Sequence, residues 1–366
     1  MPDAIIAGAG PVGLLLGCLL AGRGAEVLII ERRRGADERS RAIGIHPPGL
    51  AALDAAGIGA AVRAEAVALD GGEVHARGRM LAAVPFGAAR PVLTLAQHRT
   101  DALLRARLHA LGGTIRSGTA VVGFRDEGSR VRVRTTDGEL PTPFLVVADG
   151  VRSALRRAAG VGWIRRGRSA HYAMIDIPDP GEDRLARIHC EPGGLVESFP
   201  LPAGQRRWVI RRTDGGDAVT SEVFAEAILA RTDIGIRIPD GLAPTAFTAA
   251  QHRADHLARG RVALLGDAAH EVSPIGGQGM NLGWADAVML APLLIDGLHG
   301  TTVDLRGYAR RASARAAGAQ RRSAFYMDMG SPASRPAQRA REVAIRALGS
   351  VPLRERAAAL VTMGGL

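Results

Sequence analysis

The stretch Gly8-Ala9-Gly10-Pro11-Val12-Gly13 decides the fold, because it joins the short apolar segment Ala4–Ala7 to a longer apolar run, Leu14–Gly22. The first segment has the length of a buried strand and the second that of a helix. In such a turn the first glycine makes the tight bend, the second lets the backbone approach a pyrophosphate, and the third lets helix and strand pack closely. The helix N-terminus then offers unpaired N–H groups to phosphates. The pattern predicts dinucleotide binding.

A second predicted strand, Glu26–Ile30, is followed directly by Glu31. An acid at this place, about 20 residues after the glycine turn, binds ribose hydroxyls. A carboxylate there disfavours a 2′-phosphate, so FAD or NAD is expected rather than NADP.

Glycine (47 of 366 residues) and apolar residues (47%) set the composition. The glycines show no G-X-Y period, which excludes collagen, and recurrent Val/Ile/Leu runs exclude a low-complexity chain. The length fits one large domain or two closely associated ones. We therefore expect a globular chain that turns often or brings backbone close to a ligand.

The net charge of +11 comes from arginine alone, since the chain contains no lysine. Twelve arginines and four acidic residues lie within 301–366. A basic tail can serve nucleic acid or an anionic membrane, but biased codon usage explains the arginine excess as well. With 4% aromatic residues and no aromatics interleaved with the arginines, a nucleic-acid partner is not expected.

The two cysteines, Cys18 and Cys190, have no metal-ligand or redox spacing, and no metal site is expected. The apolar start of the chain lacks a basic leader and is interrupted by glycines and Pro11, so neither a signal peptide nor a membrane anchor is predicted. We expect a cytoplasmic protein without stable membrane insertion.

Two further segments indicate which family of FAD- or NAD-binding proteins the chain resembles. One is Leu145–Arg156, which contains Ala148-Asp149-Gly150-Val151-Arg152, and the other is Gly260–His270, which contains Gly266-Asp267 and continues to Asn281. Together with the glycine turn, these segments resemble the FAD-dependent aromatic hydroxylases, the group A flavoprotein monooxygenases related to p-hydroxybenzoate and ubiquinone-pathway hydroxylases. The resemblance covers nearly the whole chain.

The resemblance implies an α/β fold: a Rossmann-like FAD-binding domain, an inserted β-sheet substrate domain and a C-terminal helical tail. The expected segments are 1–69, 96–162 and 256–300 for the FAD-binding domain, 70–95 and 163–255 for the β-rich substrate domain, and 301–366 for the helices. Because the chain ends soon after the expected helical tail, we expect it to lack the additional thioredoxin-like C-terminal domain of some larger relatives.

In this family the Asp of the second segment binds the ribityl chain, which assigns that role to Asp267. The helix that starts near Gly279 would face the flavin pyrimidine ring, and its N-terminus would stabilise negative charge on the reduced flavin. Asp149 and its neighbours match a segment associated with both FAD and NAD(P)H; for Arg152 and Arg156 a structural salt bridge is the alternative. Arg41 matches a phosphate contact and Gln97, more loosely, another FAD contact. The complete cofactor set is Gly8, Gly10, Pro11, Val12, Gly13, Glu31, Arg32, Arg41, Gln97, Asp149, Gly150, Arg152, Gly266, Asp267, Pro274, Gly277, Gln278, Gly279, Met280 and Asn281.

The chain departs from the family at Pro48, where many relatives carry an arginine. Candidates for lining the substrate site are His46, Tyr172, Arg187 and His189, with Pro274 at the flavin side. No side chain is assigned a catalytic role, because the flavin carries the chemistry. His270 lies in a family motif where position is the safer interpretation than acid–base chemistry.

The implied reaction is hydroxylation of an aromatic or polyketide-like molecule with NADPH or NADH and O2, through a flavin hydroperoxide on tightly but non-covalently bound FAD. The alternatives are a dehydrogenase, reductase or halogenase on the same scaffold, although the Trp-x-Trp-x-Ile-Pro segment of flavin halogenases is absent. The protein is expected to be a monomer or homodimer.

Overall fold

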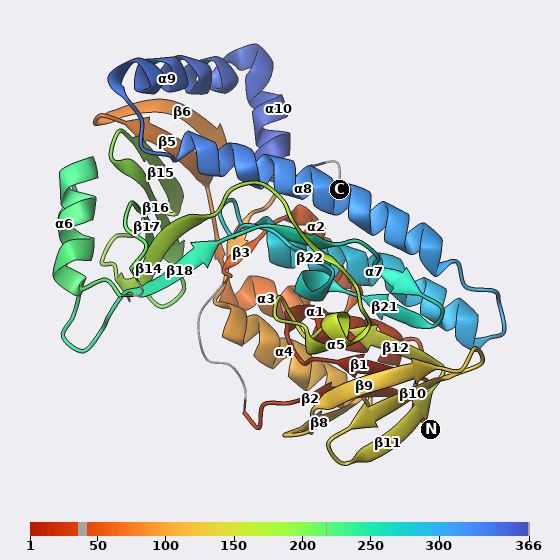
Figure 1. Ribbon diagram of the computed structural model, residues 1–366. Helices are drawn as coiled ribbons and strands as arrows, with labels where there is room; N and C mark the ends of the chain where they lie inside the picture. Colours follow the sequence, from red (N-terminus) through yellow and green to blue (C-terminus); the bar gives the residue numbers. More distant parts are fainter. Residues whose placement is uncertain (36–41, 217, 365–366) are drawn as a thin grey trace.

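A six-stranded sheet forms the centre of one half of the molecule in the computed structural model (Figure 1). The structure describes residues 1–35, 42–216 and 218–364. In spatial order the strands are β20 (Ala258–Arg259), β21 (Val262–Leu264), β12 (Phe144–Val147), β1 (Ala4–Ala7), β2 (Val27–Glu31) and β8 (Thr114–Ser117). All but β20 run parallel to their neighbours. The four strands from β21 to β2 are fully buried, as in parallel sheets covered on both faces.

Among the helices that pack with this sheet are α1 (Pro11–Ala21), α4 (Gln97–Ala110) and α7 (Gln278–Leu298). Helix α1 begins at Pro11, whose fixed φ suits the first helical position. The helix packs tightly on β2, because a Cβ on Gly17 would lie 2.9 Å from Ile29. Cys18 is buried and donates a hydrogen bond from its thiol to the Leu104 carbonyl of α4.

A small antiparallel sheet completes this half, with β9 (Val121–Asp126), β10 (Val131–Thr135) and β11 (Gly138–Thr142). The alternating Val131-Arg132-Val133-Arg134 buries both valines in the main core and leaves both arginines partly or fully exposed. This is the one-sided strand that the alternation predicts.

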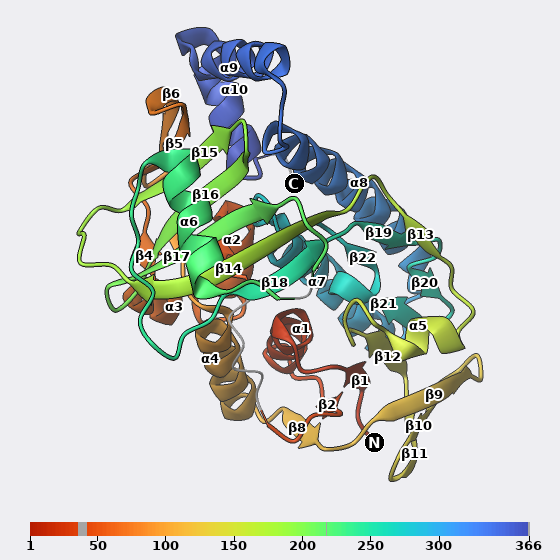
Figure 2. The ribbon, with the colours of Figure 1, turned by 60° about the vertical axis from the view of Figure 1, so that its left-hand side comes forward.

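A seven-stranded sheet forms the second half (Figure 2). Its strands, in spatial order, are β18 (Thr245–Ala249), β14 (Ala170–Pro178), β17 (Gln205–Arg212), β16 (Gly194–Leu201), β15 (Leu185–Glu191), β5 (Gly71–Ala76) and β6 (Arg79–Pro85). The two segments 71–85 and 170–249, which are far apart in sequence, thus build one sheet. Helix α6 (Ser221–Thr232) packs through Phe224 and Ile228 on one face, together with Val196 and Trp208.

The other face of this sheet packs against the C-terminal helices α8 (Leu305–Met329) and α9 (Arg335–Gly349) and the segment before α7. We call it the inner face; its buried residues include Tyr172, Val209, Leu195 and Cys190, with Ile275 and Met327 packed on them. The face on α6 is the outer face. Side chains alternate between the two faces along every strand.

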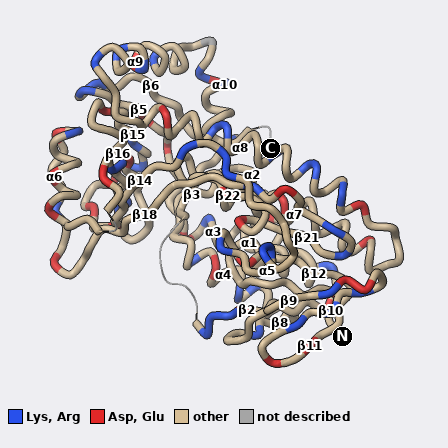
Figure 3. Tube along the Cα trace, viewed as in Figure 1, with Lys and Arg blue, Asp and Glu red and all other residues tan. Residues whose placement is uncertain are grey.

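Helix α8 runs along both halves of the molecule (Figure 1). Its first part packs Tyr308 and Ala312 into the core of the six-stranded sheet, and its end packs Met327 against the inner face. Helix α10 (Val351–Val361) follows α9. Most arginines of these helices, drawn in blue in Figure 3, are exposed. Arg341 is an exception: it is 7% exposed and donates to the carbonyls of Met329, Ser331 and Glu191.

Short elements connect the halves: β3 (Gly44–Ile45), α2 (Pro47–Ala55), α3 (Gly59–Glu65), β4 (Val67–Ala68), β7 (Leu93–Thr94), α5 (Ala154–Ala158), β13 (Trp163–Arg165), β19 (His252–Ala254), the 3₁₀ turn η1 (Gly266–Ala268) and β22 (His270–Glu271). Residues 48–64 have a helical composition, but the chain turns at Gly57 with φ +81° and forms two helices, α2 and α3. No helix in the described part of the chain is both long and apolar enough to cross a lipid bilayer.

Candidate functional site

The segments predicted to carry the chemistry all follow the carboxyl ends of parallel strands. Gly8 follows β1, Glu31 ends β2, Asp149 comes just after β12, and Gly266 comes just after β21. Since β21, β12, β1 and β2 are neighbours in one sheet, these residues lie along one edge. Ligands of open α/β sheets bind at this edge.

The glycine turn is built by close backbone contacts. Gly8 has φ +112°, and a Cβ on it would lie 2.4 Å from the Ala148 carbonyl oxygen. A Cβ on Gly13 would lie 2.2 Å from the Gly8 carbonyl oxygen. A Cβ on Gly10, in contrast, would meet no protein atom within 4 Å. Gly8 and Gly13 are therefore required by the fold, whereas Gly10 leaves space beside the start of α1.

The N-terminus of α1 carries no acidic side chain in its first turn, so its N–H groups are available to an anion. Arg105 of α4 reaches the same turn, where its Nη2 donates to the Ala9 carbonyl at 3.0 Å. The Arg105 Nε is buried and has no partner among the described residues. This guanidinium was missed in the sequence, although it lies two helical turns after Gln97 on the same helix.

Glu31 is 5% exposed and is held by backbone donors. Its carboxylate accepts hydrogen bonds from the N–H of Ala9 at 2.9 Å and from the N–H and Nε of Arg33 at 2.9 and 3.1 Å. Burial alone would raise the pKa of this carboxyl, but the hydrogen bonds from Arg33 and Ala9 outweigh it and lower the pKa. The group is therefore a carboxylate at neutral pH, able to accept further hydroxyl donors.

The second edge segment joins α1 to α7. A Cβ on Gly266 would lie 3.3 Å from Val12, and one on Gly283 would lie 2.6 Å from the same side chain. The indole Nε1 of Trp284 donates to the Pro11 carbonyl at 3.1 Å. Asp267 is exposed in the first turn of η1, next to these contacts.

Helix α7 begins beside His46. Its N-cap residue, Gly277, has φ +65°, and a Cβ there would lie 3.0 Å from the His46 Nε2. Asn281 joins the two segments: its Oδ1 accepts from the His46 N–H, and its Nδ2 donates to the carbonyls of Gly44 and Gly277. Burial lowers the pKa of His46 to about 4, so the ring is neutral at physiological pH.

Polar atoms without partners mark both helix N-termini. In the described part of the chain, the Asp149 Oδ1, the His46 Nδ1 and the Gln278 Nε2 are buried and make no hydrogen bond. Such atoms are costly unless a ligand or water satisfies them. With the open space at Gly10, the α1 N-terminus and the Glu31 carboxylate, they fit a long ligand with phosphates, ribose hydroxyls and a polar ring, which is the chemistry of FAD.

Comparison with known families agrees with this geometry. Residues 1–323 match the family model described as FAD binding domain. The chain belongs to the FAD-binding domain family. FAD is therefore the cofactor, as predicted, and the hydroxylase-like fold predicted from the motifs is confirmed.

Several relatives in this FAD-binding family are named monooxygenases. The 12-dehydrotetracycline 5-monooxygenase/anhydrotetracycline 6-monooxygenase of Streptomyces rimosus is 33% identical over 82% of this chain and 63% of its own length. A rifampicin monooxygenase of Rhodococcus hoagii is 30% identical over 82% of this chain and 65% of its own. The chain thus spans slightly less than two thirds of the length of these relatives.

Solved structures show the same architecture. The p-nitrophenol 4-monooxygenase PnpA of Pseudomonas putida superimposes with a TM-score of 0.88 over 100% of this chain and 98% of its own, at 24% identity. The OxyS anhydrotetracycline hydroxylase of Streptomyces rimosus superimposes with a TM-score of 0.80 over 100% of this chain and 76% of its own, at 29% identity.

The remaining cofactor candidates lie in different environments. Gln97 begins α4, and its Oε1 accepts weakly from the Ala42 N–H at 3.4 Å. Arg32, Arg152 and Pro274 are exposed. Arg41 lies outside the described residues.

Two groups near the cofactor edge are held by the protein itself. Arg156, 2% exposed, donates to the carbonyls of Ala268 and Val151 and stacks on Trp163, 3.6 Å from the ring centroid. It thus joins the two edge segments through carbonyls rather than through an ion pair. His270 is 1% exposed and its Nε2 lies 2.6 Å from the Asp286 Oδ2, which gives it a buried partner and a positioning role.

The four substrate candidates do not come together. His46 lies beside the start of α7, and Tyr172 lies on the inner face of the seven-stranded sheet. Arg187 and His189 lie on the outer face, because Arg187 pairs across the strands with Ser198, which pairs with Trp208. The sheet itself therefore separates these two residues from Tyr172.

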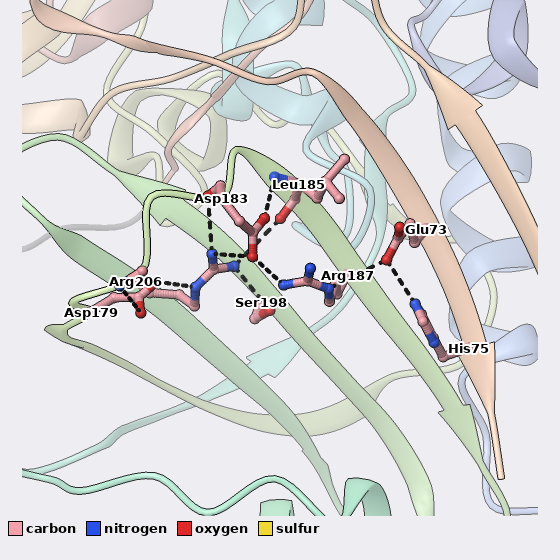
Figure 4. A network of polar contacts seen from close by, with 9 residues as sticks. Glu73, His75, Asp179, Asp183, Leu185, Arg187, Ser198 and Arg206 are labelled. Atoms are coloured by element: carbon pink, nitrogen blue, oxygen red, sulfur yellow. Dashed lines mark hydrogen bonds and ion pairs between the residues drawn. The ribbon is translucent and has the colours of Figure 1, made fainter. Parts of the chain in front are cut away.

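Arg187 also has full partners on the outer face. Figure 4 shows its guanidinium between Asp183 and Glu73, with Glu73 in turn bonded to His75. Arg206 continues the network to Asp179. His189 stacks on His75 with ring centroids 5.0 Å apart, and its burial and these neighbours lower its pKa to about 4. This network holds strands together rather than facing the cofactor edge.

The inner face carries Tyr172, which the sequence predicted for the substrate site, and further polar groups that the sequence reasoning missed. The hydroxyls of Tyr172 and of Tyr326 on α8 are buried without partners among the described residues. Arg211 lies beside Tyr172, and Glu197 is 5% exposed on the same face. Strand parity could have placed these residues together, but only with the register of the sheet known.

Proposed function

We propose that the protein is an FAD-dependent monooxygenase that hydroxylates an aromatic or polyketide-like molecule with NADPH or NADH and O2. The observation that carries the proposal is the inner face, where unpartnered tyrosine hydroxyls lie in one cluster with Ile275, directly before the helix that would meet the flavin ring. The relatives named above are monooxygenases of tetracycline intermediates and of rifampicin, which supports a polycyclic substrate.

The cofactor would be held by the residues predicted from the motifs, with Arg105 added. The α1 N-terminus and the Arg105 guanidinium would bind the phosphates, and Glu31 the ribose hydroxyls. The α7 N-terminus would stabilise negative charge on the pyrimidine end of the ring. When bound, FAD accepts hydride from the nicotinamide and activates O2 for transfer to the substrate.

The protein's own residues would orient the substrate and exclude water. Ile275, Met327 and the aromatic pair Tyr172–Phe247, with centroids 5.6 Å apart, provide an apolar surface for a ring. His46, neutral because its pKa is about 4, adds hydrogen-bonding capacity beside Gly277 without adding charge. A dry, oriented site of this kind favours oxygen transfer over loss of reduced oxygen to water.

We further propose that the six-stranded sheet with its helices is the FAD-binding domain and the seven-stranded sheet is the substrate domain, with boundaries close to those predicted. We exclude Arg187 and His189 from the substrate site, because the alternation of side chains along their strand puts them on the outer face. A cytoplasmic location and a monomeric or homodimeric state remain predictions.

The decisive experiment measures oxygen transfer. The FAD-loaded protein is incubated with NADPH or NADH and a panel of phenols, naphthols and polycyclic hydroxyarenes under 18O2. We expect at least one compound to stimulate NAD(P)H oxidation and to gain one 18O atom. Oxidation of NAD(P)H with a dehydrogenated product and no label would identify a dehydrogenase, and a rate independent of every compound would contradict hydroxylation.

A further inference from the structure

Glu197 occupies the middle of the inner face. It lies on β16, opposite Val209 on β17 and opposite Ile188 on β15. Because directly paired residues share a face, and Val209 belongs to the cluster that contains Tyr172 and Ile275, the Glu197 side chain points to the same side. This side is the one that faces α8 and the segment before α7.

The carboxyl is buried without compensation. Glu197 is 5% exposed, and it makes no hydrogen bond or ion pair with any residue that the structure describes. A buried carboxyl in this situation carries a large desolvation cost. Burial accordingly raises its pKa to about 7, so the group exchanges a proton near neutral pH. A ligand that carries a hydroxyl group could supply a hydrogen-bond partner to this carboxyl.

The neighbouring cations are engaged elsewhere. Arg207 forms a two-pronged ion pair with Asp176, at 2.6 and 2.8 Å. Arg211 donates to the Met327 carbonyl and to the Ser331 hydroxyl, and its guanidinium lies 5.8 Å from the Tyr172 ring centroid. Neither guanidinium forms an ion pair with Glu197.

Two hydroxyls complete the cluster. The Tyr172 hydroxyl has Arg211 and Glu197 as charged neighbours. The Tyr172 and Tyr326 hydroxyls are both buried, with no hydrogen-bond partner among the described residues. Each can donate or accept one hydrogen bond. A buried acceptor with two adaptable hydroxyls, on an otherwise apolar face, is complementary to a ring that carries its own hydroxyl donor.

We propose that Glu197 is the residue that binds a phenolic or enolic hydroxyl of the substrate, so that the site selects hydroxyarenes over arene carboxylates. The substrate O–H donates to the carboxylate. When the O–H bond breaks, the proton passes to a Glu197 oxygen and the electron pair stays on the substrate oxygen. The ring carbons ortho and para to that oxygen gain electron density, which prepares them for oxygen transfer. An arene carboxylate would instead place a second negative charge against Glu197. The inference rests on the proposed function.

The test uses three probes with one ring system: 1-naphthol, 1-methoxynaphthalene and 1-naphthoate. Binding to the FAD-loaded full chain is measured by titration calorimetry without NAD(P)H, so that the readout does not depend on turnover. The variants are Glu197→Leu, which removes the acceptor, and Glu197→Gln, which keeps a carbonyl acceptor but cannot take the proton. Glu226→Gln, an exposed position on α6, is the matched control.

We expect wild-type protein and Glu226→Gln to prefer 1-naphthol over both other probes. Glu197→Leu should bind 1-naphthol about 10- to 100-fold more weakly, as for a lost hydrogen bond to a charged group, and bind 1-methoxynaphthalene at least as well as before. If Glu197→Leu fails to fold, Glu197→Gln provides the test. This variant should retain most of the affinity for 1-naphthol, and its kcat should fall strongly while its KM changes little.

The proposal is overturned if wild-type protein shows no preference for 1-naphthol, or if either Glu197 variant keeps both wild-type affinity and wild-type kcat. Failure of the hydroxylase assignment is distinguishable. A Glu197-dependent preference for 1-naphthol without 18O transfer would leave the binding role intact, whereas 18O transfer unaffected by Glu197 substitution would leave the hydroxylase assignment intact and refute the role of Glu197.

Discussion

The cofactor edge and the inner face, where we propose that the substrate binds, present different kinds of groups to a ligand. At the cofactor edge the backbone has the larger part: Gly8 and Gly13 allow approaches that a Cβ would block, and two helix N-termini offer N–H groups beside the side chains of Glu31 and Arg105. On the inner face the polar groups are side chains, such as Tyr172 and Glu197, spaced along separate strands. Binding a ligand through the backbone requires glycines at fixed positions in the sequence. Binding a ligand through side chains on a sheet requires only that the strands pair in the right register. This difference explains why the cofactor edge could be predicted from the sequence and the residues of the inner face could not.

The largest expected effect contrasts two glycines of the same turn. In Gly8→Ala the new Cβ would meet the Ala148 carbonyl at 2.4 Å in a left-handed conformation, so we expect a loss of about 3 to 5 kcal/mol of stability and loss of FAD. In Gly10→Ala the Cβ meets no protein atom, so the FAD-free protein should melt as wild type while FAD binds about 10-fold more weakly. Thermal melts with and without FAD, and FAD fluorescence titrations, check both. Equal apo-protein stability in the two variants would contradict the steric account.

The two regions should also respond to pH with opposite sign. His46 has its pKa lowered from 6.5 to about 4, so the unfolded chain binds the proton first and stability falls as pH drops through that window. Glu197 has its pKa raised from 4.5 to about 7, so its contribution is present below 4.5 and is lost as pH rises to 7. Each effect is on the order of 3 kcal/mol.

Denaturation of the FAD-free protein between pH 4 and 8 measures these contributions. His46→Gln should flatten part of the acid side, leaving the contribution of His189, whose pKa is shifted in the same direction. Glu197→Gln should flatten the alkaline side only. A Glu197→Gln profile parallel to that of wild type between pH 4.5 and 7 would show that the carboxyl is not desolvated.

A smaller effect is expected where side chains support the cofactor edge. Arg156→Leu removes a buried guanidinium and leaves the carbonyls of Ala268 and Val151 unsatisfied, so it should cost about 2 kcal/mol. Arg152→Ala, an exposed change in the same segment, should alter stability by less than about 0.5 kcal/mol. Urea titrations of both variants make the comparison. A similar loss of unfolding free energy in Arg156→Leu and Arg152→Ala would contradict the structural role of Arg156.

The smallest effects separate the two faces of the sheet. Tyr172→Phe deletes a hydroxyl with no partner, so the stability of the protein should stay unchanged or rise slightly. The free energy of substrate binding should weaken by about 1 kcal/mol, which is measured as a higher KM. Arg187→Ala, on the outer face, should lower stability by about 1 kcal/mol or less and leave KM alone. Melting curves and steady-state kinetics with a substrate from the phenol panel distinguish the two. A raised KM in Arg187→Ala would place that residue back in the substrate site.

Much of the fold could be predicted because its signals are local. The helix over Ser221–Thr232, the alternating strand at Val131 and the central strand at Phe144 each follow from periodicity within a few residues. The division of residues 48–64 into two helices does not follow from composition, because a single glycine, Gly57, turns the chain within an otherwise helical stretch. Alternation also could not tell which face of the sheet a residue would occupy.

The sequence by itself predicted the cofactor and the edge where we propose that it binds, because glycine spacing, strand ends and helix starts are properties of adjacent residues. Only the tertiary structure decided the substrate side. The register between β14, β17, β16 and β15 put Tyr172 and Glu197 on one face and Arg187 and His189 on the other. That register depends on pairing between distant segments, and a shift of one residue would exchange the faces. Packing between distant segments also brought Arg105 to the glycine turn and Tyr326 to the inner face. No local sequence pattern predicts these contacts.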